Sequence, residues 1–343
     1  MQKKECEIMI SKEKIRSYAK KIGADLVGFA SMDRFEGAPE QQDPRYIFPE
    51  AKTCIVLAFR IPRGYFRGIE EGTYFAPYTA MGYAGINEVY GPIVLRELCC
   101  YIEDEGYEAV PVPNISFSTN VWQGMDLRKE KPKNKNLPVA PGRPAPDIFI
   151  DMRAAAYLAG LGEYGWSKVF LTPEFGPMQR FVALLTDFEC EPDPIFEGKI
   201  CDRCMSCARM CTGKAISTTE ADFLMLAGHR VEFAKVDLDA CGKAYRGGVA
   251  EYNPFDVNGT GLGEEWSKSQ EPFGLSLYMR HNHALEGARG CMRECYIHLE
   301  KKGVLTHKFK NEFRKRKPWT IDRSLRDESV EVKDKSDDDQ TLY

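Results

Sequence analysis

The chain has 343 residues, of which 43% are hydrophobic and 29% charged, so it is long enough for one large domain or two smaller ones. This composition excludes collagen-like, mucin-like and wholly disordered proteins. A net charge of −4 gives no overall excess of basic residues, so charge does not indicate a nucleic acid or an anionic membrane as partner. The unusual feature of the composition is its twelve cysteines.

The first residues, MQKKECEIMISK, contain neither an apolar core with a cleavage site nor a twin-arginine pair. No stretch approaches the roughly 18 apolar residues that a membrane helix needs. We therefore expect a cytoplasmic protein with no membrane partner. In the cytosol thiols stay reduced, and clustered cysteines more often bind metal or carry out redox chemistry than form disulfides.

The first 115 residues alternate between helical and extended patterns. Helical spacing of apolar residues predicts helices at 11–22 and 92–102. Short apolar, β-branched runs predict strands at 24–30, 53–61 and 107–112. This alternation predicts an α/β layer built on a mixed sheet.

Residues 126–146 hold five prolines and six basic residues against two acids, which predicts a solvated loop. Regular patterns resume with a helix at 152–159 and strands at 169–172 and 179–188. At the other end of the chain, a basic run at 307–317 precedes an acidic one, and we expect a solvated tail there.

Four cysteines form the pattern C-x2-C-x2-C-x3-C, namely Cys201, Cys204, Cys207 and Cys211. In two-cluster ferredoxins the first three ligate one [4Fe–4S] cluster and the fourth ligates the other. Zinc sites normally need only two C-x2-C pairs, so a third cysteine at the same spacing favours an iron–sulfur cluster over zinc.

A second cluster needs further thiolates, and the chain offers Cys241, Cys291 and Cys295. By the crossed ligation of such modules, Cys295 completes the first set, whereas Cys211, Cys241 and Cys291 form the second. The second set is one cysteine short, because Ala288 stands where a complete module has its eighth ligand. This site is therefore a [3Fe–4S] cluster, a [4Fe–4S] cluster with a non-cysteine ligand, or a vacant site.

The remaining cysteines are expected to be ordinary thiols, most of them buried. Cys190 lies eleven residues before the first motif and is also a candidate for recruitment to the second site. The others are Cys6, Cys54, Cys99 and Cys100.

Gly160, Gly162 and Gly165 match the G-x-G-x-x-G spacing of a dinucleotide-binding turn. That turn requires a strand before it and a helix after it, but here a predicted helix precedes and a predicted strand follows. We therefore do not expect a dinucleotide site. Glycines at this density still indicate that the backbone passes close to another segment or to a flat ligand.

The stretch AAYLAGLGEYGWSKVFLTPEFGPMQRFVALLTDFECEPDP at 155–194 directly precedes the cysteine run. It resembles the corrinoid-dependent iron–sulfur reductases, a superfamily that includes reductive dehalogenases and epoxyqueuosine reductases. AGLGEYG combined with TPEFGP is more similar to the dehalogenase form. KIGADLVGFA, FPEAKTCIVLAF and EDEGYEAVPVPN resemble the N-terminal region of the same proteins, so the resemblance covers about residues 10–300.

The resemblance implies an α+β fold, in which a nitroreductase-like α/β domain binds a corrinoid beside a C-terminal two-cluster ferredoxin-like module. Residues 1–146 are then the N-terminal part of the α/β domain, with the basic proline-rich loop, and 147–195 are its glycine-rich corrinoid-binding segment. Residues 196–305 form the iron–sulfur module, and 306–343 form a charged C-terminal tail.

The resemblance also implies roles for single residues. A proton donor is expected shortly before the glycine turn, where the candidates are Asp147, Asp151 and Tyr157. For either aspartate, capping the helix that begins at Met152 is an equally good interpretation. The residues expected to contact the corrinoid are Gly160, Leu161, Gly162, Tyr164, Gly165, Trp166, Pro173 and Gly176.

The implied function is a reductase that passes electrons through its clusters to cobalamin and reduces a small organic substrate. Its electron donor is then a reduced ferredoxin or flavodoxin-type protein. The sequence leaves open whether the protein forms a homodimer. One alternative is a corrinoid-binding electron-transfer or reductive-activation protein without its own substrate. Another is tRNA modification in the manner of epoxyqueuosine reductases, but the basic patches are only local, so we do not expect tRNA as partner.

Overall fold

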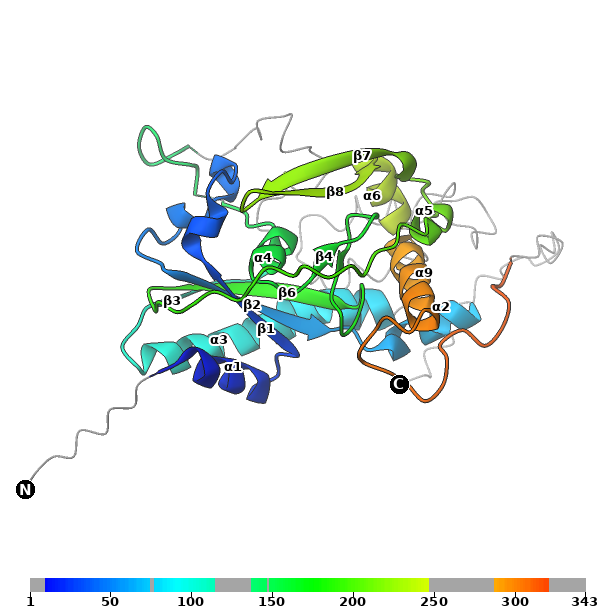
Figure 1. Ribbon diagram of the computed structural model, residues 1–343, viewed down its shortest axis with the longest axis horizontal. Helices are drawn as coiled ribbons and strands as arrows, with labels where there is room; N and C mark the ends of the chain where they lie inside the picture. Colours follow the sequence, from blue (N-terminus) through cyan, green and yellow to red (C-terminus); the bar gives the residue numbers. More distant parts are fainter. Residues whose placement is uncertain (1–9, 75–76, 115–136, 147, 247–286, 321–343) are drawn as a thin grey trace, which may run out of the picture.

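A four-stranded sheet with the order β1-β2-β6-β3 lies at the centre of the fold (Figure 1). The computed structural model describes residues 10–74, 77–114, 137–146, 148–246 and 287–320. The strands of the sheet are β1 (Leu26–Ser31), β2 (Thr53–Arg60), β6 (Gln179–Thr186) and β3 (Ala109–Val112). Helices accompany these strands, so the α+β class is confirmed.

Every pair of neighbouring strands in this sheet is antiparallel, so the prediction of a mixed sheet is wrong. The reason is the position of β6. Strands β2 and β3 run in the same direction and are connected through α3 (Gly91–Glu103), but β6 inserts between them and pairs with both. Local apolar patterns identify strands, but they do not reveal that a later strand separates two earlier ones.

Both faces of the sheet are buried. Helices α1 (Lys12–Lys21) and α3 cover one face, and α4 (Met152–Leu158) lies on the other (Figure 1). Along β2, Ile55, Leu57 and Phe59 belong to the core on the α1 side, whereas Val56 and Ala58 belong to the core on the α4 side. Burial on both faces explains why this strand is a continuous apolar run in the sequence.

Helix α1 begins and ends close to where the sequence predicts. The Ser11 side chain accepts a hydrogen bond from the Lys14 backbone N–H and so caps its first turn. Gly23 follows the helix with a φ of +125°, a conformation that favours glycine. Tyr18 stacks on Tyr101 of α3 with ring centroids 4.1 Å apart, which joins the two helices on this face.

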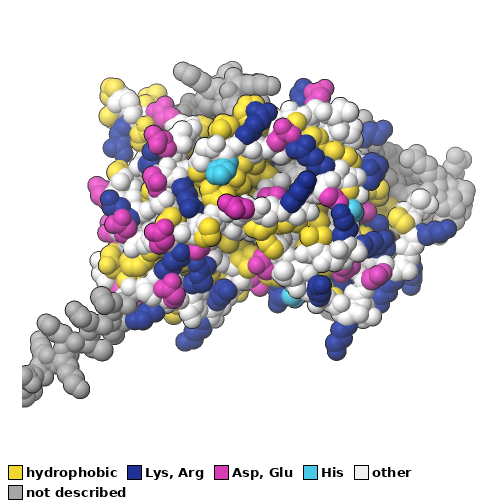
Figure 2. All heavy atoms as spheres, in the orientation of Figure 1, with side chains coloured by type: hydrophobic (Ala, Val, Ile, Leu, Met, Phe, Trp, Pro, Cys, Tyr) yellow, Lys and Arg dark blue, Asp and Glu magenta, His cyan; other side chains and the backbone are white. Residues whose placement is uncertain are grey.

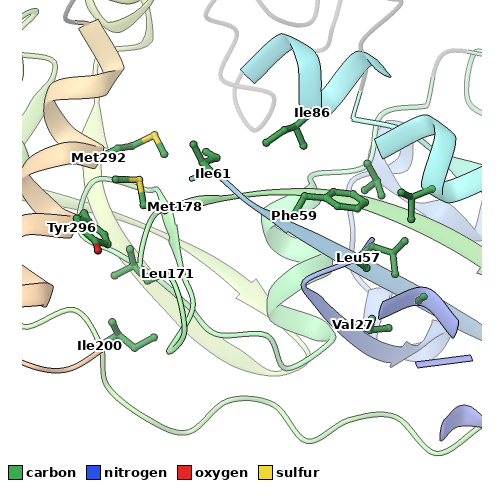
Figure 3. Packing of buried hydrophobic residues seen from close by; sticks show 14 of the residues in the cluster. Val27, Leu57, Phe59, Ile61, Ile86, Leu171, Met178, Ile200, Met292 and Tyr296 are labelled. Atoms are coloured by element: carbon green, nitrogen blue, oxygen red, sulfur yellow. The ribbon is translucent and has the colours of Figure 1, made fainter. Parts of the chain in front are cut away.

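The described residues of the cysteine-rich half of the chain include a long hairpin and three helices. These elements are β7 (Ile216–Leu226), β8 (His229–Val236), α5 (Ser206–Arg209), α6 (Leu238–Arg246) and α9 (Gly287–Lys301). The hairpin lies on the α4 side of the sheet, and α9 packs against α5 and α6 (Figure 1). Figure 3 shows Met292 and Tyr296 of α9 near Met178 and Leu171, so this half shares its core with the sheet.

The sequence patterns leave several observed elements unpredicted, among them the β7–β8 hairpin and the wide helical segment η5 (Tyr78–Tyr90). β7 is largely exposed along its length, so it lacks the apolar alternation of a half-buried strand. η5 depends on tertiary contacts, because buried Tyr78 packs against Phe66 at 4.7 Å and donates its hydroxyl to Met292 Sδ at 3.2 Å. Within the described ranges, no helix is long and apolar enough to span a membrane.

Residues 305–320 cross over α2 (Arg67–Glu71) and α9, which departs from the expected solvated tail. Phe313 is fully buried, and the Arg314 guanidinium donates to the Glu70 carboxylate at 2.9 Å. A basic segment can pack in this way because its buried charge is paired. The acidic run at 322–339 lies outside the described residues.

Asp193 ties the chain before the cysteine run to α1 and β1. Its carboxylate accepts two hydrogen bonds from Arg16 at 2.8 Å, one from the Phe29 backbone N–H at 3.0 Å, and lies 2.8 Å from Lys12 Nζ. Burial by itself raises the pKa of Asp193, but the hydrogen bonds from Arg16 and Lys12 outweigh burial and hold the pKa below its ordinary value. Folding therefore favours the ionised carboxylate.

Replacing Asp193 by Asn should destabilise the fold in a pH-dependent way. At neutral pH we expect a loss of about 2 kcal/mol in the free energy of unfolding, since charged hydrogen bonds are lost. Because the folded-state pKa is depressed, wild-type stability from this group is present above about pH 4 and is lost as the pH falls through the folded-state pKa. Urea unfolding followed by circular dichroism at several pH values measures the difference.

The matched control is Asp33→Asn, at an exposed carboxylate that should give little change at any pH. If the difference in the free energy of unfolding between wild type and Asp193→Asn does not shrink as the pH falls, the depressed pKa of Asp193 is contradicted.

Candidate metal centre

The cysteine pattern places three thiols in one loop and a fourth on a distant helix. Cys201 and Cys204 lie in the loop that leads into α5, and Cys207 lies in α5 itself. The Cys295 thiol, on α9, interacts electrostatically with the thiols of all three. The structure therefore brings together the four residues of the predicted first set.

A second group of thiols lies beside the first. The Cys291 thiol interacts electrostatically with Cys241 of α6 and with Cys211, which follows α5. Cys291 also interacts with Cys207 and Cys295 of the first set. Because Cys291 and Cys295 are four residues apart, they share one face of α9, and the two sets meet along that face.

Burial shapes the acid–base state of these thiols. Burial raises the pKa of Cys207 to about 11 and raises the pKa values of Cys291 and Cys295 well above the ordinary value. Thiolates are the form that binds metal, so binding must expel protons from an apolar site. Buried thiols next to one another are costly as free anions, and a metal cluster would supply the positive charge they lack.

The backbone around the cysteines donates hydrogen bonds to sulfur. Trp166 N–H donates to Cys201 Sγ at 3.3 Å, and Ala215 N–H donates to Cys211 Sγ at 3.4 Å. Arg203 and Met205 adopt left-handed backbone conformations, with φ values of +56° and +61°. Such conformations form concave arrays of N–H groups that recur at iron–sulfur sites, so this loop fits a cluster of iron and sulfide.

Glu163 of the glycine turn anchors the first cysteine. It lies in the short strand β4 (Glu163–Tyr164), which pairs with β5 (Phe170–Leu171). Its Oε1 accepts hydrogen bonds from the backbone N–H groups of Ile200 at 2.7 Å and Cys201 at 2.6 Å. The turn that resembles the corrinoid reductases is therefore bonded directly to the cysteine loop, a role that the sequence motif by itself does not indicate.

Asp202 links the cysteine loop to the end of α9. Its carboxylate lies 2.9 Å from His298 Nε2 and also accepts a hydrogen bond from Lys302. Asp202, His298 and Cys204 have ligand atoms within 4.8 Å of one another. This link holds α9, and with it Cys295, against the loop that carries the other three thiols.

The glycines of the turn are required by neighbouring protein backbone. A Cβ atom on Gly160, at a φ of +72°, would lie 2.1 Å from the Pro194 carbonyl oxygen. A Cβ atom on Gly162 would lie 2.0 Å from the Leu171 carbonyl oxygen. Of the two explanations for clustered glycines, close approach of another segment accounts for both positions.

The other residues expected at the corrinoid also contact protein. Tyr164 and Trp166 are each 5% exposed, and the Trp166 indole N–H donates to the Ser217 carbonyl at 2.8 Å. Gly176 closes a bridge with Thr172. Leu161 packs against the core on the α4 side, and Gly165 lies against Leu171. The Pro173 carbonyl accepts a hydrogen bond from the Thr306 N–H. Corrinoid contact at these positions stays a prediction.

The candidate proton donors occupy different environments. Asp151 caps α4 by accepting hydrogen bonds from the backbone N–H groups of Arg153 at 2.9 Å and Ala154 at 3.4 Å. Burial raises its pKa, but the charges of Arg153 and Lys168 and the hydrogen bonds from the backbone together outweigh burial, so the net pKa of Asp151 is lowered. Tyr157 is buried in α4, and burial raises its pKa. Asp147 lies outside the described residues.

Tyr164, one of the residues expected to contact the corrinoid, is a buried polar group. Its ring stacks on Phe233 at 5.6 Å, and among the described residues its hydroxyl has no hydrogen-bond partner. Burial raises its pKa well above the ordinary value, and Asp151 and Arg153 are its charged neighbours. Arg153 also interacts electrostatically with Cys241, so it is a charged neighbour both of this hydroxyl and of the second set of thiols.

The other described cysteines lie apart from the two sets. Cys190 packs near α1, with Thr53 Oγ1 at 3.8 Å from its sulfur and Lys12 as a charged neighbour. Cys54 is fully buried in β2, and burial raises its pKa to about 12. Cys99 and Cys100 lie in α3, whereas Cys6 is outside the described residues.

A stretch of 67 residues, 19% of this chain, is 42% identical to the tetrachloroethene reductive dehalogenase of Sulfurospirillum multivorans and covers 13% of that protein. The predicted resemblance is confirmed. No protein-family model matches the sequence.

Solved structures of the same two groups have a partial likeness to this fold. The catabolic reductive dehalogenase NpRdhA has a TM-score of 0.47 and 17% identity, over 83% of this chain and 37% of its own. Epoxyqueuosine reductase from Streptococcus thermophilus has a TM-score of 0.42 and 20% identity, over 60% of this chain and 54% of its own. The Bacillus subtilis enzyme has a TM-score of 0.44 and 16% identity, over 88% of this chain and 87% of its own.

Replacing Glu163 by Gln should loosen the first set of thiols. The change removes the negative charge that accepts hydrogen bonds from the Ile200 and Cys201 N–H groups. Loss of these charged hydrogen bonds should lower the free energy of unfolding by about 2 kcal/mol. After anaerobic reconstitution we expect a lower iron content per chain and a weaker electron paramagnetic resonance signal from one cluster. Glu220→Gln, at an exposed carboxylate paired with Lys235, is the matched control. Equal iron content in both variants would show that the anchor is dispensable.

Proposed function

We propose that this chain is a corrinoid-dependent iron–sulfur oxidoreductase, similar to reductive dehalogenases, that reduces a small organic substrate. The observation that carries the proposal is the bond between two motifs: Glu163 of the AGLGEYG turn accepts hydrogen bonds from Ile200 and Cys201, at the start of the cysteine loop. The segment that resembles the dehalogenases and the sets of thiols are therefore parts of one structure.

Within this proposal, the first set binds one [4Fe–4S] cluster through Cys201, Cys204, Cys207 and Cys295. The second set offers Cys211, Cys241 and Cys291, which suit a [3Fe–4S] cluster or a [4Fe–4S] cluster with another ligand. The N–H groups that donate to Cys201 and Cys211 stabilise the added negative charge of a reduced cluster. Within the second set Cys291 is buried, whereas Cys211 and Cys241 are half-buried.

A corrinoid, when bound, supplies a strongly reducing cobalt centre. Protein backbone closes the turn at Gly160 and Gly162, so these two glycines are explained without a corrin ring. The proposal of a corrinoid rests on the sequence resemblance, and Tyr164 and Trp166 remain candidates for contact. For proton delivery, Tyr157 and Asp151 remain candidates, and Arg153 holds Asp151 ionised.

The electron donor in this proposal is a reduced ferredoxin or flavodoxin-type protein, and the setting is the cytoplasm. Clusters held by the two sets of thiols would carry single electrons from this donor. The substrate is a small organic molecule whose identity the site does not define.

The decisive experiment is a cobalamin titration of the anaerobically reconstituted protein, followed by absorbance and electron paramagnetic resonance. We expect saturable binding at micromolar protein and a changed cobalt signal. Absence of binding under these conditions would overturn the proposal. Single-turnover formation of a dehalogenated product from the chemically reduced, cobalamin-loaded protein would then establish reductase chemistry.

A second candidate function has a specific observation in its favour. The second set contains three described thiols rather than four, which suits a protein that carries electrons or reductively activates a corrinoid protein. This candidate predicts cobalamin binding without product formation over a panel of organohalides. Salt-dependent binding of tRNA would instead favour tRNA modification.

Replacing single cysteines tests the assignment of the two sets. Cys204→Ala should abolish one cluster signal and leave the other, whereas Cys241→Ala should do the reverse. The wild type should hold about seven to eight irons per chain if both sites fill. Cys190→Ala is the control and should retain both signals. Loss of both signals in either test variant would contradict two separate sets.

A further inference from the structure

The loop that carries the first set of thiols reaches the protein surface. Asp202 and Arg203 are exposed, and Cys204 is half-buried between Arg203 and the partly exposed Met205. The Cys204 thiol donates a hydrogen bond to Ser206 Oγ at 3.4 Å, also near the surface. A cluster held here would therefore lie close to solvent.

Each set combines one buried thiol with half-buried ones, and the buried thiols are Cys207 and Cys291. Half-buried Cys204 of the first set and Cys211 of the second lie next to the exposed residues Arg203 and Met210. Because electron-transfer rates fall steeply with distance, a protein that delivers electrons should approach this exposed stretch of the loop and α5. The geometry therefore favours it as the entry point.

Basic side chains surround this loop. Arg203 and Arg209 come from the loop and α5, while Lys301 and Lys302 come from the end of α9. The link from Asp202 to Lys302 brings these two segments together. Figure 2 shows Lys and Arg side chains gathered at the end of the molecule that contains α9 and α5.

The acidic residues nearby neutralise only part of this charge. Asp202 pairs with Lys302, and Glu232 pairs with Arg203 at 2.7 Å. Within the described part of the chain, Arg209 and Lys301 form no ion pair, and Arg209 donates only to Ser206 Oγ at 3.2 Å. The surface therefore has a net positive charge, and exposed Met210, at 39%, adds an apolar contact.

We propose that the surface formed by Arg203, Arg209, Met210, Lys301 and Lys302 is the docking site for a small electron-carrier protein with an acidic surface. Complementary charge increases the rate of encounter and orients the partner, which suits a transient complex. In the complex one electron passes from the reduced carrier to the oxidised cluster, and no bond is made or broken. The inference rests on the proposed function only in that electrons enter through the clusters.

The test is stopped-flow reduction of the reconstituted holoprotein by a reduced acidic plant-type ferredoxin at several salt concentrations. In wild type we expect the second-order rate constant to fall as salt rises. The double variant Arg209→Glu and Lys301→Glu should lower the rate constant by about tenfold or more at low salt. Reduction by dithionite and iron content should match wild type, since dithionite needs no docking surface.

The matched control is Lys20→Glu and Lys21→Glu, the same change of charge at exposed residues at the end of α1. An equal loss of rate in both double variants would show a general charge effect and overturn the docking site. A rate that does not vary with salt, or no reduction of wild type by ferredoxin where dithionite succeeds, would overturn it as well. If the double variant loses iron, the salt dependence of the wild-type rate constant still tests the docking site.

The outcome is separable from the proposed function. Salt-dependent reduction by ferredoxin without any cobalamin binding would support the docking site and refute the corrinoid reductase. Cobalamin binding together with a reduction rate that does not depend on salt would support the corrinoid reductase and refute the docking site.

Discussion

The position of α9 is the constraint on which the cysteine-rich half of this protein depends. Cys291 and Cys295 lie one helical turn apart on α9, so the helix presents one thiol to each set. Met292 and Tyr296 pack into the core shared with the sheet (Figure 3). Only when α9 is held at this place does Cys295, far along the chain from the first cysteine motif, join the predicted first set of thiols.

Several polar links hold α9 in position. Near the middle of the helix, Arg293 and Glu294 join a buried ion network with Glu70 and Arg314. Breaking one partner of such a network typically costs about 3–5 kcal/mol, because the remaining charge stays buried. Towards its C-terminal end, Glu300 pairs with Arg63, and His298 and Lys302 pair with Asp202 beside the first set. The basic C-terminal segment thus packs because it supplies Arg314 to the network.

Sequence reasoning predicted most of the sheet and of the helices that cover it. Apolar patterns located α1, β2, α3 and β6 closely, because each buries a local stripe or run of apolar residues. The same reasoning missed the β7–β8 hairpin, whose exposed strand has no such pattern. It also gave the wrong sheet type, because strand order depends on contacts between distant segments.

By itself, the sequence determined which thiols lie close together locally. The spacing of Cys201, Cys204 and Cys207 demands a short loop that presents three thiols together, whatever the rest of the fold. Only the tertiary structure decided which distant thiols join them, and that Glu163 bonds the glycine turn to that loop. The physical reason is that spacing is a local property of the chain, whereas burial, charge pairing and close backbone approach arise between segments that folding brings together.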